Sequence, residues 1–278
     1  MTDTRAPSTE ALLRVRGLKV AYAIRSSVLL RKVGENVAVS DVNFDVVPGE
    51  TVGLVGESGS GKSTIARTII GLVEASAGTI EFEGRHITGL GARELKQVRR
   101  EMQMVFQDPF ASLNPRLTVR DLIAEAWRVH HAVVPRSAWT EEAKELMARV
   151  GLNPDYADRY PHQFSGGQRQ RIGIARALAL RPKLIICDEA VSALDVSVQA
   201  QVLNLLDDLQ EDLGLSYLFI SHDLSVIKHL CDRVLVLNQG VVVEEGPVAD
   251  IFDKPRDSYT KTLLDAIPVV RPWLESGR

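Results

Sequence analysis

One stretch near the N-terminus, TVGLVGESGSGKSTIARTIIGL, constrains the fold more than any other part of the chain. It begins with an apolar run typical of a buried strand and ends with apolar residues at helical spacing. The turn between them fits the phosphate-loop pattern G-x-x-x-x-G-K-[ST] at Gly56, Gly61, Lys62 and Ser63. A strand, a glycine-rich turn and a helix in this order predict the nucleotide-binding unit of an α/β protein.

The residue types in this turn suit a nucleotide triphosphate bound with magnesium. The glycines let backbone N–H groups face the β-phosphate, and the Lys62 ammonium neutralises the β and γ oxygens. The Ser63 hydroxyl is the expected magnesium ligand. We expect the rest of the loop to contribute to nucleotide binding as well, through Ser58, Gly59, Ser60 and Thr64.

The composition fits one large domain with an inserted subdomain. At 278 residues and 45% hydrophobic content the chain can bury a full core, and we interpret residues 1–278 as a single domain. The 33 basic and 36 acidic residues give a net charge of -3, which argues against binding to a nucleic-acid backbone. Local basic patches remain compatible with this charge.

Other features predict a protein that is neither exported nor membrane-spanning. The polar N-terminus, MTDTRAPSTEALLRVRG, lacks the apolar core of a secretory signal, and the longest apolar runs are strand-sized. Cys187 and Cys231 have no paired metal spacing, so we expect reduced, structural cysteines of a cytosolic protein. Any role at a membrane must then come through partners.

The order of the predicted elements suggests three parts. Residues 12–47 form short β-like runs joined by a basic loop around Arg31, Lys32 and Gly34, which predicts an antiparallel β layer. Residues 108–161 have a helical character and are interpreted as a helical insertion. Closer to the C-terminus, strands and helices alternate, which implies a mostly parallel sheet covered by helices.

A pair of acids, Asp188 and Glu189, follows the apolar run LIIC. The pair lies at the C-terminal edge of a predicted buried strand, where α/β proteins bind ligands. Asp188 is expected to hold magnesium directly or through water, and Glu189 to polarise the attacking water as a base. The alternative is that both acids only cap the following turn, which the phosphate loop makes the weaker interpretation.

Three more side chains are weaker candidates when each is taken alone. His222 follows the apolar run YLFI, so its imidazole could contact the γ-phosphate. Gln107 also follows an apolar run, and its amide could meet both magnesium and the nucleophilic water. Tyr22 could stack on a purine ring. Residues of these types are more often structural, so the sequence alone leaves both interpretations open.

The stretch YPHQFSGGQRQRIGIARAL contains a second device suited to binding phosphate. An SGG turn precedes a basic, amphipathic helix pattern, and a helix N-terminus opened by Ser and Gly offers free backbone N–H groups and a positive dipole end. The turn comprises Ser165, Gly166, Gly167 and Gln168. One chain therefore carries two predicted phosphate-binding turns that are far apart in sequence.

Taken together, these motifs resemble an ABC-type ATPase domain in order and spacing over nearly the whole chain. The resemblance rests on the phosphate loop, Gln107, FSGGQRQR, LIICDE, SALD and His222. It implies an α/β fold with a P-loop NTPase core of the ABC type, an antiparallel β layer and an inserted helical subdomain. In that family the SGGQ turn lies far from its own phosphate loop and completes the nucleotide site of a facing subunit.

The resemblance extends to the ATP-binding subunits of oligopeptide and dipeptide importers. Matching phrases include GLVGESGSGKST, MVFQDPFASLNPR, SALDVSVQAQVLNLL and DSYTKTLLDAIP, the last within a family-type tail at residues 247–278. Phe164 replaces a more usual Leu before SGGQ, and Ala190 replaces the usual Pro after the acids, without removing a functional group. The sequence lacks the cysteine-rich extension of some relatives, which predicts that it holds no iron–sulfur cluster.

The resemblance implies a motor subunit that binds ATP and Mg²⁺ and hydrolyses ATP. The implied partners are a second ABC ATPase subunit, two membrane permease subunits and, indirectly, an extracytoplasmic solute-binding protein, with no nucleic acid. Such a subunit would lie peripherally at the cytoplasmic face of the inner membrane. The alternatives are a soluble ABC ATPase of a non-transport complex and an ATP-binding scaffold without turnover. The motifs do not encode the transported solute.

Overall fold

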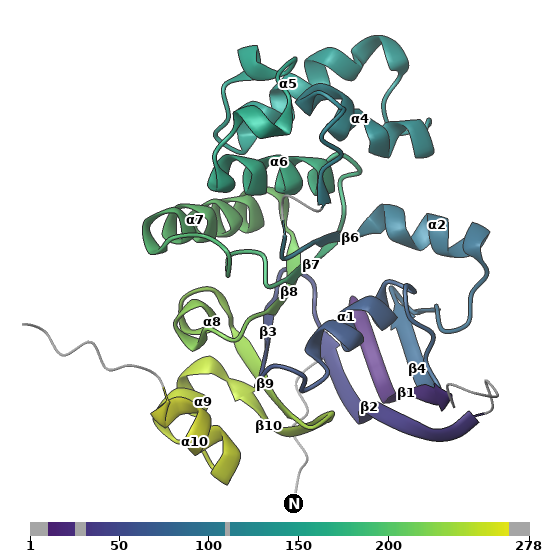
Figure 1. Ribbon diagram of the computed structural model, residues 1–278, viewed down its shortest axis with the longest axis vertical. Coiled ribbons are helices and arrows are strands. Elements are labelled where there is room, and N and C mark those ends of the chain that lie inside the picture. Colours follow the sequence, from purple (N-terminus) through teal and green to yellow (C-terminus); the bar gives the residue numbers. More distant parts are fainter. Residues whose placement is uncertain (1–10, 26–31, 109–111, 267–278) are drawn as a thin grey trace, which may run out of the picture.

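The chain folds into a helical lobe above a body that contains two β-sheets (Figure 1). The structure is a computed structural model, and it describes residues 11–25, 32–108 and 112–266. Strands from the body run up toward the helical lobe, so the two parts share one continuous core.

The central sheet has the strand order β10-β9-β3-β8-β7-β6. Its strands are β3 (Thr51–Val55), β6 (Met102–Val105), β7 (Leu184–Asp188), β8 (Ser216–Ile220), β9 (Arg233–Asn238) and β10 (Val241–Pro247). Neighbouring strands are parallel except for β9 and β10. Every residue of β3, β7 and β8 is buried, as expected for strands that are covered on both faces. The predicted, mostly parallel sheet is confirmed.

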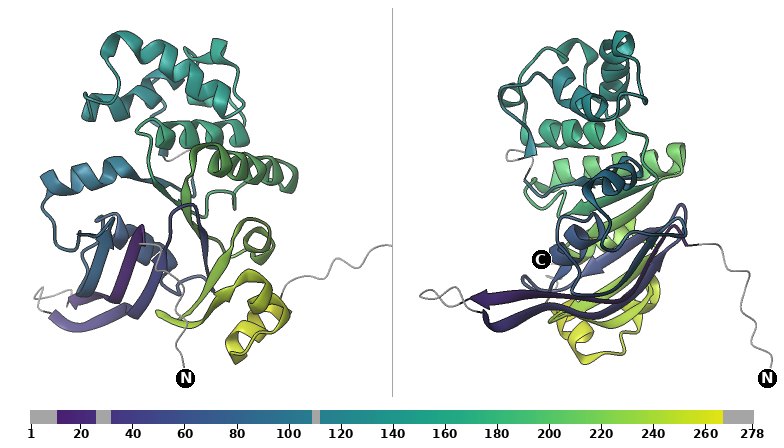
Figure 2. Two further views of the ribbon diagram at one scale, coloured as in Figure 1. Left: turned by 180° about the vertical axis from the view of Figure 1, so that it is seen from behind. Right: turned by 90° about the vertical axis from the view of Figure 1, so that its right-hand side faces the viewer.

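A second, antiparallel sheet has the order β2-β1-β4-β5 and forms the curved layer seen in Figure 2. It consists of β1 (Leu13–Arg25), β2 (Lys32–Val46), β4 (Ala77–Phe82) and β5 (Arg85–His86). The antiparallel layer is confirmed, but the basic loop predicted within it is shorter than expected. Lys32 and Gly34 belong to β2, because the backbone ladder continues and pairs them with β1. Arg31 lies outside the described residues.

Helices accompany both sheets. They are α1 (Lys62–Ile69), α2 (Ala92–Glu101), α7 (Val196–Leu213), α8 (Leu224–Leu230), α9 (Val248–Asp253) and α10 (Ser258–Asp265). Side chains at the helix starts explain where three of them begin: Asp195 caps α7, Asp223 caps α8 and Asp257 caps α10, each accepting a bond from a first-turn N–H. Gly214 ends α7 in a left-handed conformation with φ +63°.

The helical lobe contains α4 (Val119–Val129), α5 (Trp139–Arg149) and α6 (Gly166–Leu178), with short 3-10 helices at Arg136–Ala138, Pro154–Tyr156 and Pro161–Gln163. Trp127 is fully buried there, and its indole N–H donates to the Ala179 carbonyl over 2.8 Å. Both α4 and α5 pack on α6, so the lobe includes a helix beyond residue 161. The boundaries 108–161 of an inserted subdomain stay a prediction.

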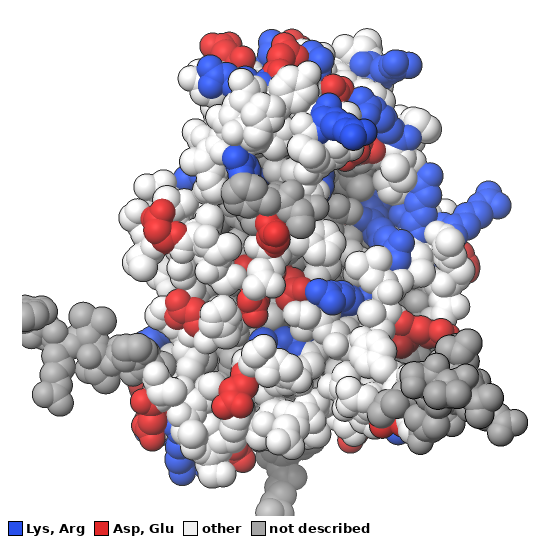
Figure 3. All heavy atoms as spheres, viewed as in Figure 1, with Lys and Arg blue, Asp and Glu red and all other residues white. Residues whose placement is uncertain are grey.

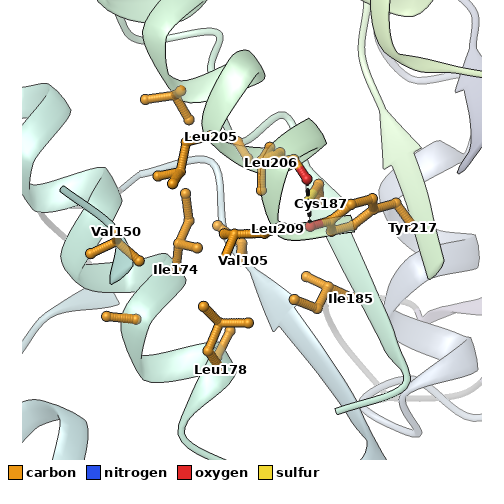
Figure 4. Close-up of a cluster of buried hydrophobic side chains, with 14 of the residues drawn as sticks. Val105, Val150, Ile174, Leu178, Ile185, Cys187, Leu205, Leu206, Leu209 and Tyr217 are labelled. Carbon is orange, nitrogen blue, oxygen red and sulfur yellow. Dashed lines mark hydrogen bonds between the residues drawn. The ribbon is translucent and has the colours of Figure 1, made fainter. Parts of the chain in front are cut away.

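Two hydrophobic clusters join these layers. One combines the antiparallel sheet and α1 with one face of the central sheet, and it includes Leu54 and Ile69. The other, shown in Figure 4, combines the opposite face with α6 and α7. In this second cluster the Tyr217 hydroxyl donates to the Leu206 carbonyl over 3.0 Å. Cys187 is buried in it as a free thiol, and burial raises its pKa to about 12.

The face of the molecule shown in Figure 3 carries a concentration of positive charge. Lys and Arg gather on the side of the molecule where α2 lies (Figure 3). In this helix Arg93, Lys96 and Arg100 are exposed, whereas the Arg99 guanidinium donates to backbone carbonyls just after α1. Over the rest of this face the two signs of charge are mixed. A net charge of -3 thus coexists with a local basic patch.

Candidate active site

The phosphate loop joins β3 to α1 and is shaped by glycines. Gly56 has φ +149° and Gly61 has φ +107°. A Cβ atom on Gly56 would lie 2.1 Å from the carbonyl oxygen of Leu237, and one on Gly61 would lie 2.5 Å from that of Ala38. Both positions therefore need glycine for two reasons, the backbone angle and the close approach of another backbone. Because α1 begins at Lys62, its N-terminal N–H groups adjoin the loop.

Lys62 is buried, with 5% of its surface exposed, and the loop itself holds its ammonium group. Nζ donates to the carbonyl oxygens of Gly56 and Glu57, each over 2.7 Å. Burial lowers the pKa of Lys62, while two nearby carboxylates, Glu189 and Asp188, oppose this shift. A cation in such a partly desolvated site attracts phosphate oxygens more strongly than it would in water.

Ser63 and Asp188 form the expected magnesium-binding pair. The Ser63 hydroxyl donates to Asp188 Oδ1 over 2.7 Å, and Asp188 is 4% exposed at the end of β7. Burial raises the pKa of Asp188, whereas the bond from Ser63 and the charge of Arg67, 3.9 Å away, lower it.

The donor set fits magnesium bound together with a nucleotide. Among the described residues no group of three or more His, Cys, Asp and Glu side chains could hold a metal ion. Magnesium in nucleotide sites usually takes one or two protein oxygens and completes its shell with phosphates and water, so a hydroxyl and one carboxylate are sufficient. The geometry of Ser63 and Asp188 is therefore compatible with the predicted role.

Glu189 lies next to two other predicted residues, Gln107 and His222. Its backbone N–H donates to the Ile220 carbonyl over 3.0 Å, which ties the turn after β7 to the end of β8. The Gln107 amide donates to Glu189 Oε2 over 2.7 Å, and His222 Nδ1 lies 3.4 Å from Oε1. Gln107, Glu189 and His222 follow β6, β7 and β8, so the carboxyl ends of three adjacent parallel strands bring them together.

Much of the phosphate loop lines one pocket, together with Gln107 and Glu189. Its walls are formed by Ala38, Ser58, Gly59, Gly61, Lys62, Ser63, Thr64, Gln107 and Glu189. Ser60 also belongs to the loop, but its side chain is buried, and its Oγ accepts a bond from Lys62 Nζ over 3.3 Å. Ala38, on β2, is a wall residue that the sequence analysis missed. Its local sequence carries no signal, because the contact arises only when the two sheets pack together.

Tyr22 lies on β1 with 44% of its surface exposed. A register shift between Val20 and Ala21 marks a β-bulge, after which Tyr22 pairs with Asn36 of β2. Val39 pairs with Val20 and Val37 with Ala21, so Ala38 is the extra residue of this bulge. Tyr22 is not among the described residues that line the phosphate pocket, and its stacking on a purine stays a prediction.

The SGGQ turn begins α6 in the helical lobe, and none of its residues is among the described residues that line the phosphate pocket (Figure 1). Ser165 Oγ accepts from the Gln168 N–H over 3.3 Å, and Gln168 Oε1 accepts from the Ser165 N–H over 3.0 Å, which forms a capping box. The N–H groups of Gly166 and Gly167 lie in the first turn, where a helix offers no acceptor. The turn thus has a geometry suited to binding an anion, and its role as a second phosphate-binding device stays a prediction.

Comparison with known proteins agrees with this geometry. The ABC transporter family model matches residues 39–192, and the model of the oligopeptide/dipeptide transporter C-terminal region matches residues 243–278. The oligopeptide transport ATP-binding protein AppF of Bacillus subtilis (strain 168) is 53% identical over 96% of this chain and 81% of its own length. The corresponding protein OppF of Haemophilus influenzae is 49% identical over 99% of this chain and 83% of its own length.

One further relative and two solved structures are also similar to this chain. The glutathione import ATP-binding protein GsiA of Escherichia coli (strain K12) is 52% identical over 95% of this chain and 42% of its own length. Among solved structures, cbiO1 from Clostridium perfringens has a TM-score of 0.74 and 25% identity, with 88% of this chain and 91% of that chain covered. A dimeric ATP-binding cassette in a post-hydrolysis state with ADP and Pi has a TM-score of 0.75 and 28% identity, with 85% and 98% covered.

The helices of the chain also bear on its relation to a membrane. Within the described ranges, none of them combines the length and the apolar character that a membrane span requires.

The phosphate loop, the two acids, the SGGQ turn and the relatives agree on one family. The chain belongs to the ABC transporter family, as an ATPase subunit of the oligopeptide and dipeptide transporter type.

Proposed function

We propose that this chain is the ATP-hydrolysing motor of an importer for oligopeptides or dipeptides. The observation that carries the proposal is the position of Glu189, whose carboxylate accepts a bond from Gln107 and lies beside His222 at the phosphate loop. A carboxylate held in this way suits a base for water better than it suits a surface acid. The solute class is supported by two relatives that are named for oligopeptide transport.

In the bound state, the β- and γ-phosphates of ATP lie on the N–H groups of the loop and on Lys62, whose ammonium exchanges loop carbonyls for phosphate oxygens. Ser63 and Asp188 would hold Mg²⁺, with help from the Gln107 amide oxygen. When bound, the ion neutralises charge on the β and γ oxygens. The Tyr22 ring stacks on the adenine, so both ends of the nucleotide are fixed.

Hydrolysis then needs a base and a sensor. Glu189 takes a proton from the attacking water molecule. The oxygen of this water forms a bond to the γ-phosphorus while the bond between the γ-phosphorus and the bridging oxygen breaks, which yields ADP and inorganic phosphate. Gln107 fixes one carboxylate oxygen of this base through its amide. The His222 side chain is 57% exposed, so it can contact the γ-phosphate as well as Glu189 and respond when the phosphate leaves.

The second anion-binding turn serves a partner. Ser165 can donate its hydroxyl proton to a phosphate while its oxygen accepts from Gln168, and the N–H groups of Gly166 and Gly167 add further donors. In the proposed complex these groups complete the ATP site of a second ABC ATPase subunit. Two membrane permease subunits would use the closing motion, and a solute-binding protein would act indirectly. The chain would then lie peripherally at the cytoplasmic face of the membrane.

Magnesium-dependent phosphate release from ATP tests the motor function. The purified chain should release phosphate with MgATP, lose this activity when EDTA removes the ion, and regain it when magnesium is restored. ATP binding without any release of phosphate would contradict the proposal and favour a nucleotide-regulated scaffold.

Copurification tests the role in transport. The tagged native chain, extracted from membranes, should bring down two permease subunits, and the linked solute-binding protein then identifies the solute class. Recovery only with soluble partners would favour the alternative, an ABC ATPase of a non-transport complex. Such a result would leave the ATPase assignment intact and overturn the importer assignment alone.

A further inference from the structure

The peptide group between Gly56 and Glu57, at the start of the phosphate loop, is held at both of its polar ends. Its carbonyl oxygen, on Gly56, accepts from Lys62 Nζ over 2.7 Å. Its N–H, on Glu57, donates to the hydroxyl oxygen of Tyr259 over 3.0 Å. Lys62 belongs to the nucleotide site, but Tyr259 lies about two hundred residues away on α10, and the proposed mechanism gives it no role.

Tyr259 is itself held firmly by its surroundings. Its own N–H donates to the side chain of Asp257, the residue that caps α10. Glu244 of β10 fixes the same turn, because its two carboxylate oxygens accept from the N–H groups of Arg256 and Asp257 over 2.8 and 3.1 Å. The Tyr259 ring packs against the hydrophobic core. These contacts fix the position of Tyr259, so its hydroxyl is held next to the phosphate loop.

We propose that Tyr259 is a positioning residue for the phosphate loop, through which the C-terminal region is coupled to nucleotide binding. The inference rests on the proposed ATPase function and adds a residue that acts through the Glu57 backbone. α10 falls within residues 243–278, the part matched by the C-terminal family model rather than by the ABC transporter model. The coupling thus joins a segment outside the ATPase family match to the ATP site.

The backbone freedom of Gly56 explains why this peptide group needs a second hydrogen-bond partner. Glycine has little steric preference between backbone conformations, so rotation of the adjoining peptide plane costs less there than elsewhere. When Lys62 turns from the Gly56 carbonyl to a phosphate, the peptide loses one of its two polar partners. The Tyr259 hydroxyl then remains as the bond that keeps the loop in its phosphate-binding shape.

Replacement of Tyr259 by phenylalanine tests the inference, because it removes only the hydroxyl. One neutral hydrogen bond of ordinary strength corresponds to an increase of about three- to tenfold in the KM for ATP, with kcat within about twofold of the parent value. Thr262→Val is the matched control, since the Thr262 hydroxyl lies on the same helix and donates only within it, to the Ser258 carbonyl. The control variant should leave both constants unchanged.

A second measurement separates positioning from a general loss of stability. Coupling is reciprocal, so addition of MgADP should slow amide hydrogen exchange in residues 257–266 of the parent chain and of Thr262→Val. The Tyr259→Phe variant should lose this nucleotide-dependent protection at an unchanged melting temperature.

An unchanged KM in Tyr259→Phe would overturn the inference about Tyr259 and leave the proposed ATPase function intact. Protection of α10 by MgADP that persists without the hydroxyl would have the same consequence. A lowered melting temperature together with equal losses in kcat and in ATP affinity would also overturn it, in favour of a purely structural tyrosine. Failure of the parent chain to bind or hydrolyse ATP would instead refute the proposed function, so the two failures are distinguishable.

Discussion

Glu189 combines two properties that a purely structural acid would not need. Its backbone has φ +52°, a left-handed conformation that few residues other than glycine adopt. Its carboxylate, with the side chain 18% exposed, accepts a bond from Gln107 and lies near His222. Lys62, by contrast, is a buried cation held on loop carbonyls. At the residue scale, the proposed function thus gives phosphate binding to Lys62 and water activation to Glu189.

Two substitutions separate these roles. Lys62→Ala should abolish hydrolysis by weakening phosphate binding, whereas Glu189→Gln should keep ATP binding and lower turnover by about 10² or more, because the amide cannot accept the proton. Phosphate release and a nucleotide-binding titration measure the two properties separately.

The matched controls are Lys254→Ala and Glu211→Gln, which change exposed residues that are not among those lining the phosphate pocket. Both controls should keep binding and turnover. Normal turnover by Glu189→Gln would contradict the assignment of the base.

At the residue scale, the sequence predicted those residues whose chemical role is indicated by a local sequence motif. The phosphate loop and the two acids at the end of β7 are such residues, and the structure brings them together with Gln107 and His222. The sequence could not predict Ala38 or Tyr259. An alanine in a strand and a tyrosine in a C-terminal helix have no distinctive local pattern, and their contacts with the loop depend on long-range packing.

Among the elements, those with strong apolar patterns were predicted best. The buried strands β7 and β8 contain the apolar runs LIIC and YLFI that the sequence analysis identified. β10 and α9 were not predicted from the sequence. β10 is an edge strand without a fully buried residue and contains two glutamates, so neither an apolar run nor a clear alternation marks it. Its partner β9, which is buried through its middle, defines its position.

The start of α6 carries the prediction that belongs to the element scale. Ser165→Arg should stop hydrolysis although Ser165 is not among the residues that line the chain's own phosphate pocket, because a bulky cation would fill the γ-phosphate pocket of the partner. Binding of ATP to the isolated chain should persist, since the phosphate loop is unchanged. Phosphate release and nucleotide titration provide the two readouts.

The control for this substitution is Ser137→Arg, which places the same side chain at an exposed serine in the same lobe. This variant should hydrolyse ATP normally. Full activity of the Ser165→Arg protein, when every copy in the sample carries the change, would show that α6 does not complete a nucleotide site.

At the scale of the whole molecule, the proposed function divides the ATP site into two halves. The phosphate loop with Asp188 and Glu189, in the body, would form one half, and the start of α6, in the helical lobe, would form the other (Figure 1). Two copies facing head to tail would join the halves in pairs. ATP then supplies much of the interface, so a closed homodimer should depend on bound ATP and disappear after hydrolysis.

Light scattering with the Glu189→Gln protein tests this shared-site arrangement most directly. Without nucleotide the mass should be near 30.6 kDa, and with MgATP it should about double, because ATP is bound but not consumed. The double variant Glu189→Gln with Ser165→Arg should bind ATP and stay monomeric. A stable dimer without nucleotide that ATP does not change would contradict the arrangement and indicate a separate, permanent interface.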